Sequence, residues 1–242
     1  MLNEKMVAIL SDSKETGWVL EPEAKRFFSL AGLSIPKFIW ARNEDEAVRF
    51  AERVGYPVVA KIVSPKVIHK TEKKGVAVGI HHPERLIEEF RRFRQIEGFQ
   101  GVLVEETLSG IEVIIGAKVD DQFGPVVLLG MGGTGVEIYR DVALRMAPLQ
   151  QRDIESMMKC LKGHKILEGY RGSPAVNSGE LTRLLMTFSD LVMDLEERIE
   201  SIDLNPVFCS SERCVIGDAR IMLKGISDWS LRDASPRSRI AD

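Results

Sequence analysis

One lysine stands inside an apolar stretch of the chain, where a charge is costly. Lys61 comes near the end of PVVAKIV (residues 57–63), a short run that is otherwise almost wholly apolar and predicts a strand. A buried ammonium group costs free energy unless it reaches solvent or an anion. Lys61 is therefore either an edge lysine that extends into water or a phosphate contact held on a rigid strand, and the residue alone leaves both open.

Three oxygen-bearing side chains come from two segments that would form a terminal pair of strands. DLNP (203–206) lies in one expected strand and GDAR (217–220) in the next. A hairpin would bring Asn205 and Asp218 side by side, with Asp203 close by. Carboxylate and amide oxygens suit Mg²⁺ that is also held by phosphates. Asp and Asn are equally common at polar turns, so a plain hairpin tip is the alternative.

Two glutamates and a glycine-rich loop lie between these regions. Glu105 falls at the end of an apolar run, and Glu112 interrupts the next one, LSGIEVIIG. A carboxylate at Glu112 could accept hydrogen bonds from ribose hydroxyls, or it could face solvent from an edge strand. GMGGTG (130–135) could bring backbone N–H groups close to an anion, although ordinary hairpin glycines would look the same. Because no helix is expected to follow, the loop matches neither the dinucleotide fingerprint nor the Walker loop.

The elements that must position these residues are helices and strands in mixed order. Helical periodicity and suitable end residues predict helices over 22–33, 43–54, 83–95, 150–162 and 179–199. Apolar runs predict strands over 35–40, 57–63, 75–82, 101–107, 111–119, 125–131, 201–209 and 214–223. The fold class is therefore α+β with mainly antiparallel strands. Two lobes joined near residue 103 fit this order. The expected divisions are an N-terminal extension (1–20), an N-terminal lobe (21–102), a C-terminal lobe (103–227) and a loose tail (228–242).

The order of these features resembles that of the ATP-grasp fold, in which two lobes enclose a nucleotide cleft. Longer segments resemble the nucleotide-binding β subunit of NDP-forming acyl-CoA synthetases, such as ADP-forming acetate–CoA ligase. They are GYPVVAKIVSPKVIHKTEKKGV, GIEVIIGAKVDDQFGPVVLLGMGGTGVEIYRDVALRMAPL, LEGYRG, and IDLNPVF followed by GDARI. The β subunit of succinyl-CoA synthetase is a more distant likeness. The resemblance covers about residues 20–225.

The resemblance implies an acid–thiol ligase that interconverts acyl-CoA, ADP and phosphate with acid, CoA and ATP. In this family the reaction passes through an acyl phosphate and a phosphohistidine, and Mg²⁺ accompanies the nucleotide. The CoA-binding domain belongs to an α part, and nothing in this sequence resembles such a domain. A separate CoA-binding α subunit, in a heterotetramer, is therefore the expected partner.

The resemblance also assigns roles to matching positions. Those expected around the nucleotide are Lys61 on the phosphates, Gly75 and Val76 at the end of the phosphate-covering loop, Glu105 at the hinge beside adenine, and Glu112 at the ribose. Those expected at the magnesium ion are Asn205 and Asp218, with Asp203 as an acidic neighbour.

His69 matches the histidine of the family's HK[ST] segment, which the resemblance implies is a second phosphoryl carrier. A neutral imidazole is a competent nucleophile near pH 7 and forms a phosphoramidate. The lysines around it, Lys66, Lys70, Lys73 and Lys74, could hold the charge of a phosphohistidine. Without the resemblance, an exposed loop histidine on a basic surface would be the simpler interpretation.

One position departs from the family pattern. Where relatives usually have two glycines before the valine, this chain has Lys74 and Gly75. A lysine cannot replace a glycine at positive φ without strain, so the phosphate loop is expected to differ from that of the relatives, or the activity to be reduced.

Two other functions stay open from the sequence. The chain could be an ATP-binding regulatory protein without turnover, which the Lys74 departure and the missing CoA-binding domain permit. It could also be a standalone ATP-grasp ligase that joins a carboxylate to an amine. Such a ligase would use Lys61, Glu112, Asn205 and Asp218 without His69.

Composition excludes some classes of partner. The 242 residues carry a formal net charge of −3, which gives no basic field for nucleic acid. No apolar run is long enough to span a bilayer, and the N-terminal MLNEKMVAIL lacks the layout of a signal peptide. The three cysteines, Cys160, Cys209 and Cys214, have no framework spacing and predict reduced thiols in a cytoplasmic protein.

Overall fold

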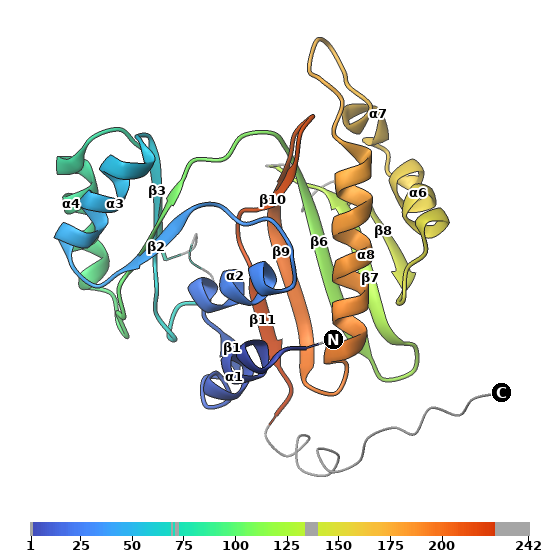
Figure 1. Cartoon of the computed structure of the whole chain (residues 1–242), viewed down its shortest axis with the longest axis horizontal. Helices are drawn as coiled ribbons and strands as arrows, with labels where there is room; N and C mark the ends of the chain where they lie inside the picture. The colour runs from blue at the N-terminus through green and yellow to red at the C-terminus, as the bar shows by residue number, and fades with distance from the viewer. Residues whose placement is uncertain (1, 69, 71–72, 134–139, 226–242) are drawn as a thin grey trace.

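The chain forms two units, each built on its own sheet with helices on one face (Figure 1). The structure, a computed structural model, describes residues 2–68, 70, 73–133 and 140–225. Both units mix helices with antiparallel strands, as expected for the ATP-grasp architecture.

The smaller unit is an antiparallel four-stranded sheet with two helices against one face. Its strands, in the order β2–β5–β3–β4, are Phe38–Ala41, Val102–Glu106, Val58–Ile62 and Val76–Ile80. The helices are α3 (Glu44–Val54) and α4 (Pro83–Arg94). Side chains alternate along a strand, so Ala60 and Val104 enter the core under the helices. Their neighbours Lys61 and Glu105 consequently point to the other face.

The larger unit is a sheet of seven strands in the described part of the chain. Six follow the order β1–β11–β9–β6–β7–β8, and β10 pairs with β9. In chain order the strands are β1 (Trp18–Val19), β6 (Ile111–Asp120), β7 (Gly124–Met131), β8 (Val142–Met146), β9 (Ile199–Cys209), β10 (Cys214–Ile216) and β11 (Arg220–Leu223). The helices are α1 (Glu4–Asp12), α2 (Glu21–Leu30), α6 (Gln151–Cys160), α7 (His164–Leu167) and α8 (Ser178–Leu195).

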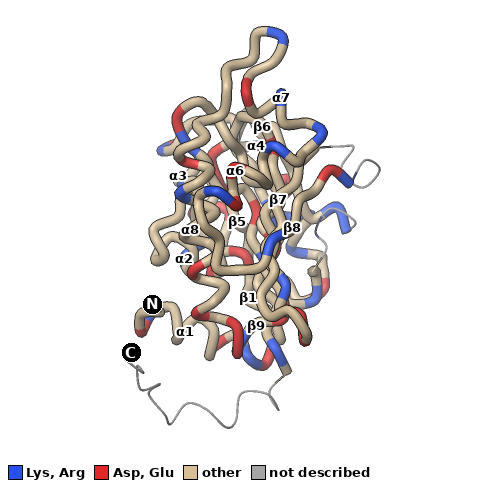
Figure 2. Tube along the Cα trace, turned by 90° about the vertical axis from the view of Figure 1, so that its right-hand side faces the viewer, with Lys and Arg blue, Asp and Glu red and all other residues tan. Residues whose placement is uncertain are grey.

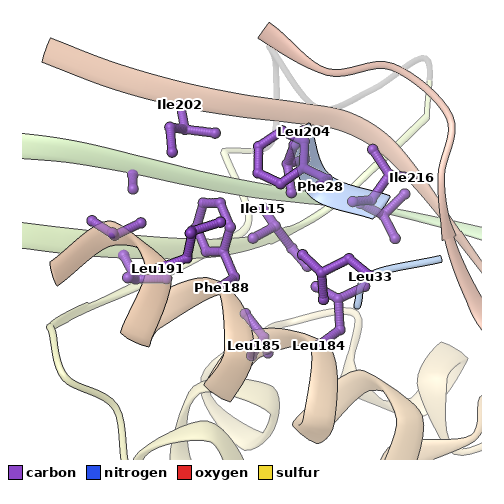
Figure 3. Packing of buried hydrophobic residues seen from close by; sticks show 14 of the residues in the cluster. Phe28, Leu33, Ile115, Leu184, Leu185, Phe188, Leu191, Ile202, Leu204 and Ile216 are labelled. Atoms are coloured by element: carbon purple, nitrogen blue, oxygen red, sulfur yellow. The ribbon is translucent and has the colours of Figure 1, made fainter. Parts of the chain in front are cut away.

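One apolar core holds this larger unit together (Figure 3). Phe188 of α8 and Phe28 of α2 pack with ring centroids 6.5 Å apart, above Ile115 and Leu204 of the sheet. The buried positions of β6 and β9 alternate with half-buried or exposed ones, so helices cover one face and polar side chains lie on the other.

The division between the units differs from the expected one. The boundary expected near residue 103 falls inside β5, which pairs with β2 and β3 in the smaller sheet. The chain instead passes from one unit to the other over residues 107–110, between β5 and β6.

The N-terminal residues belong to the larger unit, which the sequence did not predict. Within the extension expected at 1–20, β1 pairs with β11, and Met6 and Leu10 enter the larger core. Helix α2, expected in the N-terminal lobe, buries Phe27 and Phe28 in that core as well. A short amphipathic helix buries its apolar face against whichever sheet lies beside it, and sequence order alone does not say which. The tail expected at 228–242 lies outside the described residues.

Charged residues of both signs are interspersed over the described chain (Figure 2). Among the residues with a described position, no helix is long and apolar enough to cross a membrane.

Phe188→Ala should lower the free energy of unfolding by about 3–5 kcal/mol, because the fully buried ring leaves a cavity in the larger core. Urea denaturation measures this loss. Met186→Ala on the same helix, where the side chain is 39% exposed, is the control and should cost under about 1 kcal/mol. Equal losses in the two variants would contradict the packing described here.

Candidate functional site

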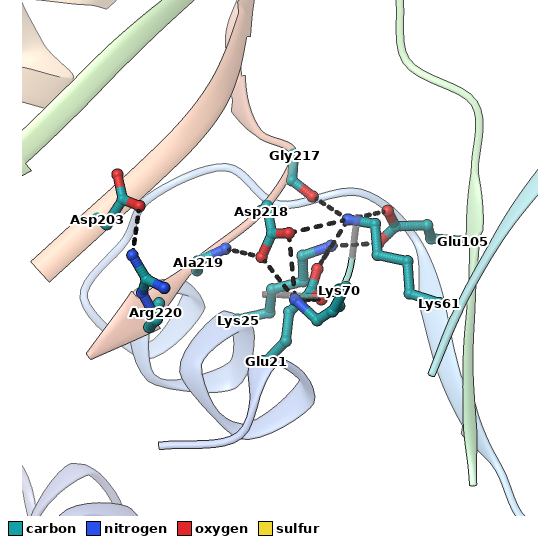
Figure 4. A network of polar contacts seen from close by, with 10 residues as sticks. All are labelled: Glu21, Lys25, Lys61, Lys70, Glu105, Asp203, Gly217, Asp218, Ala219 and Arg220. Atoms are coloured by element: carbon teal, nitrogen blue, oxygen red, sulfur yellow. Dashed lines mark hydrogen bonds and ion pairs between the residues drawn. The ribbon is translucent and has the colours of Figure 1, made fainter. Parts of the chain in front are cut away.

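Three ammonium groups and three carboxylates meet between the two units (Figure 4). We call this set the ion cluster; its members are Lys25, Lys61, Lys70, Glu21, Glu105 and Asp218. Glu105 and Lys61 come from the smaller sheet, Lys70 from the loop after β3, Glu21 and Lys25 from α2, and Asp218 from the turn before β11. The cluster therefore joins elements of both units.

Strand register places Lys61 and Glu105 together. In the pairing of β3 with β5, Val59 is opposite Glu105 and Lys61 is opposite Leu103. Lys61 and Glu105 are consequently diagonal neighbours on the face turned away from α3 and α4. The Nζ atom of Lys61 lies 2.7 Å from Oε1 of Glu105.

Lys61 also reaches across to the larger unit. Its ammonium group donates hydrogen bonds to Oε1 of Glu21 at 2.8 Å and to the carbonyl oxygen of Gly217 at 2.7 Å. Oδ2 of Asp218 lies 4.0 Å away. The side chain is only 8% exposed, so the strand lysine neither sits at an edge nor extends into water. It holds a point charge at the junction of the two units.

Helix α2 supplies two charged residues that the sequence analysis did not single out. Lys25, fully buried, lies 3.0 Å from Oε1 of Glu21 one helical turn earlier and also pairs with Glu105. A signal was present in the sequence. Glu21 and Lys25 are spaced i, i+4 on the same stripe of the helix as the apolar residues Ala24 and Phe28.

Lys70 fixes the loop after β3 to the cluster. Its ammonium group is 2.6 Å from Oε2 of Glu21 and 3.2 Å from both carboxylate oxygens of Asp218. The carbonyl oxygen of Lys70 accepts a hydrogen bond from the N–H of Gly75 at 2.6 Å, which closes the loop. His69, the expected phosphoryl carrier, precedes Lys70 in the chain and lies outside the described residues.

Contacts within the cluster favour the charged forms of Lys61, Glu21 and Lys70. Burial alone would lower the pKa of the Lys61 ammonium group, but the carboxylates of Glu105 and Glu21 outweigh it and hold the pKa well above its usual 10.5. Burial would raise the pKa of the Glu21 carboxyl group, but Lys61, Lys70 and Lys25 hold it well below 4.5. For Lys70, Asp218 and Glu21 likewise overcome burial and raise the pKa. Around neutral pH these three groups are therefore fixed charges.

The residues expected at magnesium are only partly brought together. β9 and β11 place Asp203 opposite Arg220, whose guanidinium group donates to Asp203 at 3.0 Å (Figure 4). Asp218 instead faces the lysines, and its N–H donates to the carbonyl oxygen of Pro206, directly after Asn205. No group of three or more His, Cys, Asp or Glu in the described chain could hold a metal ion. Asp218 and Asn205 still offer the hard oxygens that Mg²⁺ prefers, whereas Asp203 is engaged elsewhere.

Glu112 and the glycine-rich loop lie beside each other. Glu112 alternates with the buried Val113, so it belongs to the face of the larger sheet opposite the helices. Its carbonyl oxygen accepts a hydrogen bond from the N–H of Gly132 at 2.7 Å, where an added Cβ would come within 2.7 Å of Glu112 Cβ. A ribose contact by Glu112 stays a prediction, and residues 134–135 of the glycine loop lie outside the described residues.

The end of the loop after β3 has the strain that the sequence predicts for Lys74. Lys74 has φ of 51°, and its carbonyl oxygen accepts from Arg92 at 2.6 Å. An added Cβ on Gly75 would lie 2.6 Å from Cγ2 of Ile62, so that position admits no larger residue without a shift. Val76 begins β4 directly opposite Lys61. Gly75 and Val76 therefore bring the loop back to the strand that carries the lysine.

Comparison with known proteins decides the family. The profile of the ATP-grasp domain matches residues 11–223. The β subunit of acetate–CoA ligase [ADP-forming] I of Pyrococcus furiosus is 40% identical over 213 residues, which cover 85% of this chain and 91% of that protein. This chain belongs to the ATP-grasp family of ADP-forming acetate–CoA ligase β subunits.

Solved structures agree with this assignment of the ATP-grasp β subunit. Dinucleotide-forming acetyl-coenzyme A synthetase 1 of Ca. Korarchaeum cryptofilum, in complex with coenzyme A and Ca-AMPCP, is 39% identical and superposes with a TM-score of 0.83, covering 90% of this chain and 99% of that one. The same protein with coenzyme A and Mg-AMPPCP has its phosphohistidine segment pointing towards the nucleotide binding site; it is 38% identical with a TM-score of 0.79, covering 90% of this chain and 100% of that one.

Lys74→Gly should raise the free energy of unfolding of the ATP-grasp β subunit by about 1 kcal/mol, because a glycine adopts positive φ without the strain of a side chain. Thermal and urea unfolding measure the gain. Lys73→Gly, next to it and without a positive φ, is the control and should bring no gain. A Lys74→Gly variant less stable than the wild type would show that the side chain matters more than the backbone.

Glu21→Gln should lower the free energy of unfolding by about 3 kcal/mol at pH 7, because it removes a buried partner of three ammonium groups. The folded pKa of Glu21 lies below its usual 4.5, so its contribution is complete above that pH and is lost as the pH falls through the folded value. Urea denaturation at a series of pH values should therefore give a constant gap between wild type and variant from about pH 5 to 9. The gap should close below pH 4.5; one that persists unchanged at acid pH would refute the assignment.

Proposed function

We propose that this ATP-grasp β subunit is the nucleotide-binding part of an ADP-forming acyl-CoA ligase. The reaction is acyl-CoA + ADP + phosphate ⇌ acid + CoA + ATP. The observation that carries the proposal is the buried, permanently charged Lys61 between the two units, in a chain that is 40% identical to such a subunit.

The residues expected around the nucleotide each have a part in this proposal. Lys61 and Lys70 bind the nucleotide phosphates, and the loop closed by Gly75 and Val76 covers them. Glu112 accepts hydrogen bonds from the ribose, and the segment at Glu105 lies beside the adenine. The carboxylate of Glu105 pairs with Lys25 and Lys61, so in this proposal it holds Lys61 in place and does not contact the base.

Asp218 and Asn205 would hold Mg²⁺, which when bound neutralises charge on the phosphates. Lys70 lies against both carboxylate oxygens of Asp218, so in this proposal the lysine and the metal ion share that carboxylate. Asp203 would join the metal site only by leaving Arg220.

His69 would carry the phosphoryl group between the nucleotide and the partner. The bond from the γ-phosphorus to the bridging oxygen of ATP breaks, a nitrogen–phosphorus bond to the imidazole forms, and ADP leaves with the electron pair. A CoA-binding α subunit, assembled with this chain as a heterotetramer, would then receive the group. The proposal places the chain in the cytoplasm, where its three free thiols would stay reduced.

Phosphorylation of the purified chain tests the proposal. The wild type and His69→Ala would be incubated with γ-labelled ATP and Mg²⁺, with and without a candidate α subunit. The control is His81→Ala, which removes an exposed histidine outside the loop. The proposal expects an acid-labile, base-stable label on the wild type and the control, and at least a tenfold loss in His69→Ala.

Two outcomes would favour the other functions. Nucleotide binding without any label, even with a cognate α subunit, would indicate a regulatory ATP-binding protein. ATP turnover that His69→Ala retains, with an amine as the acceptor, would indicate a carboxylate–amine ligase.

A further inference from the structure

Lys25 is a buried charge that the proposed phosphate chemistry does not use. Its side chain is fully buried on α2, in a helix whose neighbouring residues pack in the larger apolar core. Burial of an unpaired ammonium group costs several kcal/mol, so the group must be matched by anions. Its partners are Glu21 and Glu105, and both of these also hold Lys61.

The ion cluster contains equal numbers of positive and negative groups. Three ammonium groups face three carboxylates, all within contact distance of at least one opposite charge. Lys25 is the one ammonium group of the three with no exposed surface, whereas Lys61 and Lys70 keep 8% and 11% of their side chains exposed. An entering phosphate could therefore reach Lys61 and Lys70 but not Lys25.

We propose that Lys25 and Glu21 are positioning residues that set the charge at the phosphate site through Lys61. Lys25 offsets one of the two negative charges that Glu21 and Glu105 together place beside Lys61, so that the Lys61 ammonium group can exchange a carboxylate for a phosphate oxygen. This inference rests on the proposed nucleotide-binding function.

The proposal makes the two residues act in opposite directions. Without Lys25, the site carries one more negative charge than positive; Glu105 then depends on Lys61, and Glu21 on Lys61 and Lys70. A phosphate is then repelled and meets a lysine that is held more firmly. Without the carboxylate of Glu21, the balance turns positive and Lys61 and Lys70 each lose a competing anion. Both changes destabilise the fold, yet only the first should weaken nucleotide binding.

A purely structural role predicts a different result. If Glu21 and Lys25 only fasten α2 to the smaller sheet, removal of either residue loosens the same contact. Stability and nucleotide affinity would then fall together in both variants. The sign of the affinity change for Glu21→Gln therefore separates the two roles.

Titration calorimetry with Mg·ADP and with the magnesium complex of a non-hydrolysable ATP analogue tests the proposal on the full chain. The variants are Lys25→Met, Glu21→Gln and the charge-balanced double variant Glu21→Gln/Lys25→Met, each also melted to record its Tm. Ser189→Ala is the stability control, because it removes a buried hydrogen bond from Leu149 in the larger core, away from the cluster.

The expected results differ from variant to variant. Lys25→Met should weaken binding about tenfold, a size within the range of coupling energies between contacting charges. Glu21→Gln should bind as tightly as the wild type or more tightly despite a lower Tm. The double variant should return to within about threefold of the wild type, and Ser189→Ala should lower the Tm with unchanged affinity.

Other results would overturn the proposal. It fails if Glu21→Gln and Lys25→Met weaken binding alike, or if Lys25→Met binds as the wild type does. If Lys25→Met does not fold, the double variant decides. Restored charge balance predicts that the double variant folds and binds nucleotide. A purely structural role of Glu21 and Lys25 predicts that it does neither. A wild type that binds no nucleotide would instead refute the proposed function itself, and this inference with it.

Discussion

An ammonium group taken out of water must be surrounded by anions, and Lys61 lies in such a place. Its position requires β3, β5, helix α2 and the turn at Gly217 to meet within hydrogen-bond distance. Removal of one partner leaves an uncompensated charge, which costs several kcal/mol. The requirement therefore acts on elements from both units at once. It fixes how the smaller sheet sits against the larger one more narrowly than non-directional apolar packing would.

In the proposed function, the same constraint prepares the site for phosphate. Donors already fixed in a water-poor place need little rearrangement when an anion arrives, which is why preorganised charges bind and stabilise phosphoryl groups well. Lys61 and Lys70 are both held by carboxylates of the protein. A nucleotide would replace the carboxylates as the partner of these lysines. Its affinity would therefore reflect the difference between the lysine–phosphate and the lysine–carboxylate contacts.

Local patterns in the sequence predicted much of this arrangement. The features that depend on contacts between distant parts of the chain were not predicted. Lys61 stood out because a charge interrupts an apolar strand, and the strand pattern placed most elements within a few residues. Glu21 and Lys25 were missed because an i, i+4 ion pair is ordinary on a helix surface, and only the tertiary structure shows that this surface is buried. The boundary at residue 103 was wrong for a similar reason: β5 joins the smaller sheet through pairings with distant strands. Asp203 lies opposite Arg220 because of the register between β9 and β11, which the local sequence pattern did not predict.

The pairing of β1 with β11 has a consequence for synthesis on the ribosome. All four strands of the smaller sheet lie between residues 38 and 106, so that sheet can form while the rest of the chain is still being made. The larger sheet takes its outermost strand from residues 18–19 and that strand's neighbour from 220–223. Until the last of these emerges, β1 has no strand to pair with, and the apolar side chains of Trp18 and Val19 stay available to chaperones.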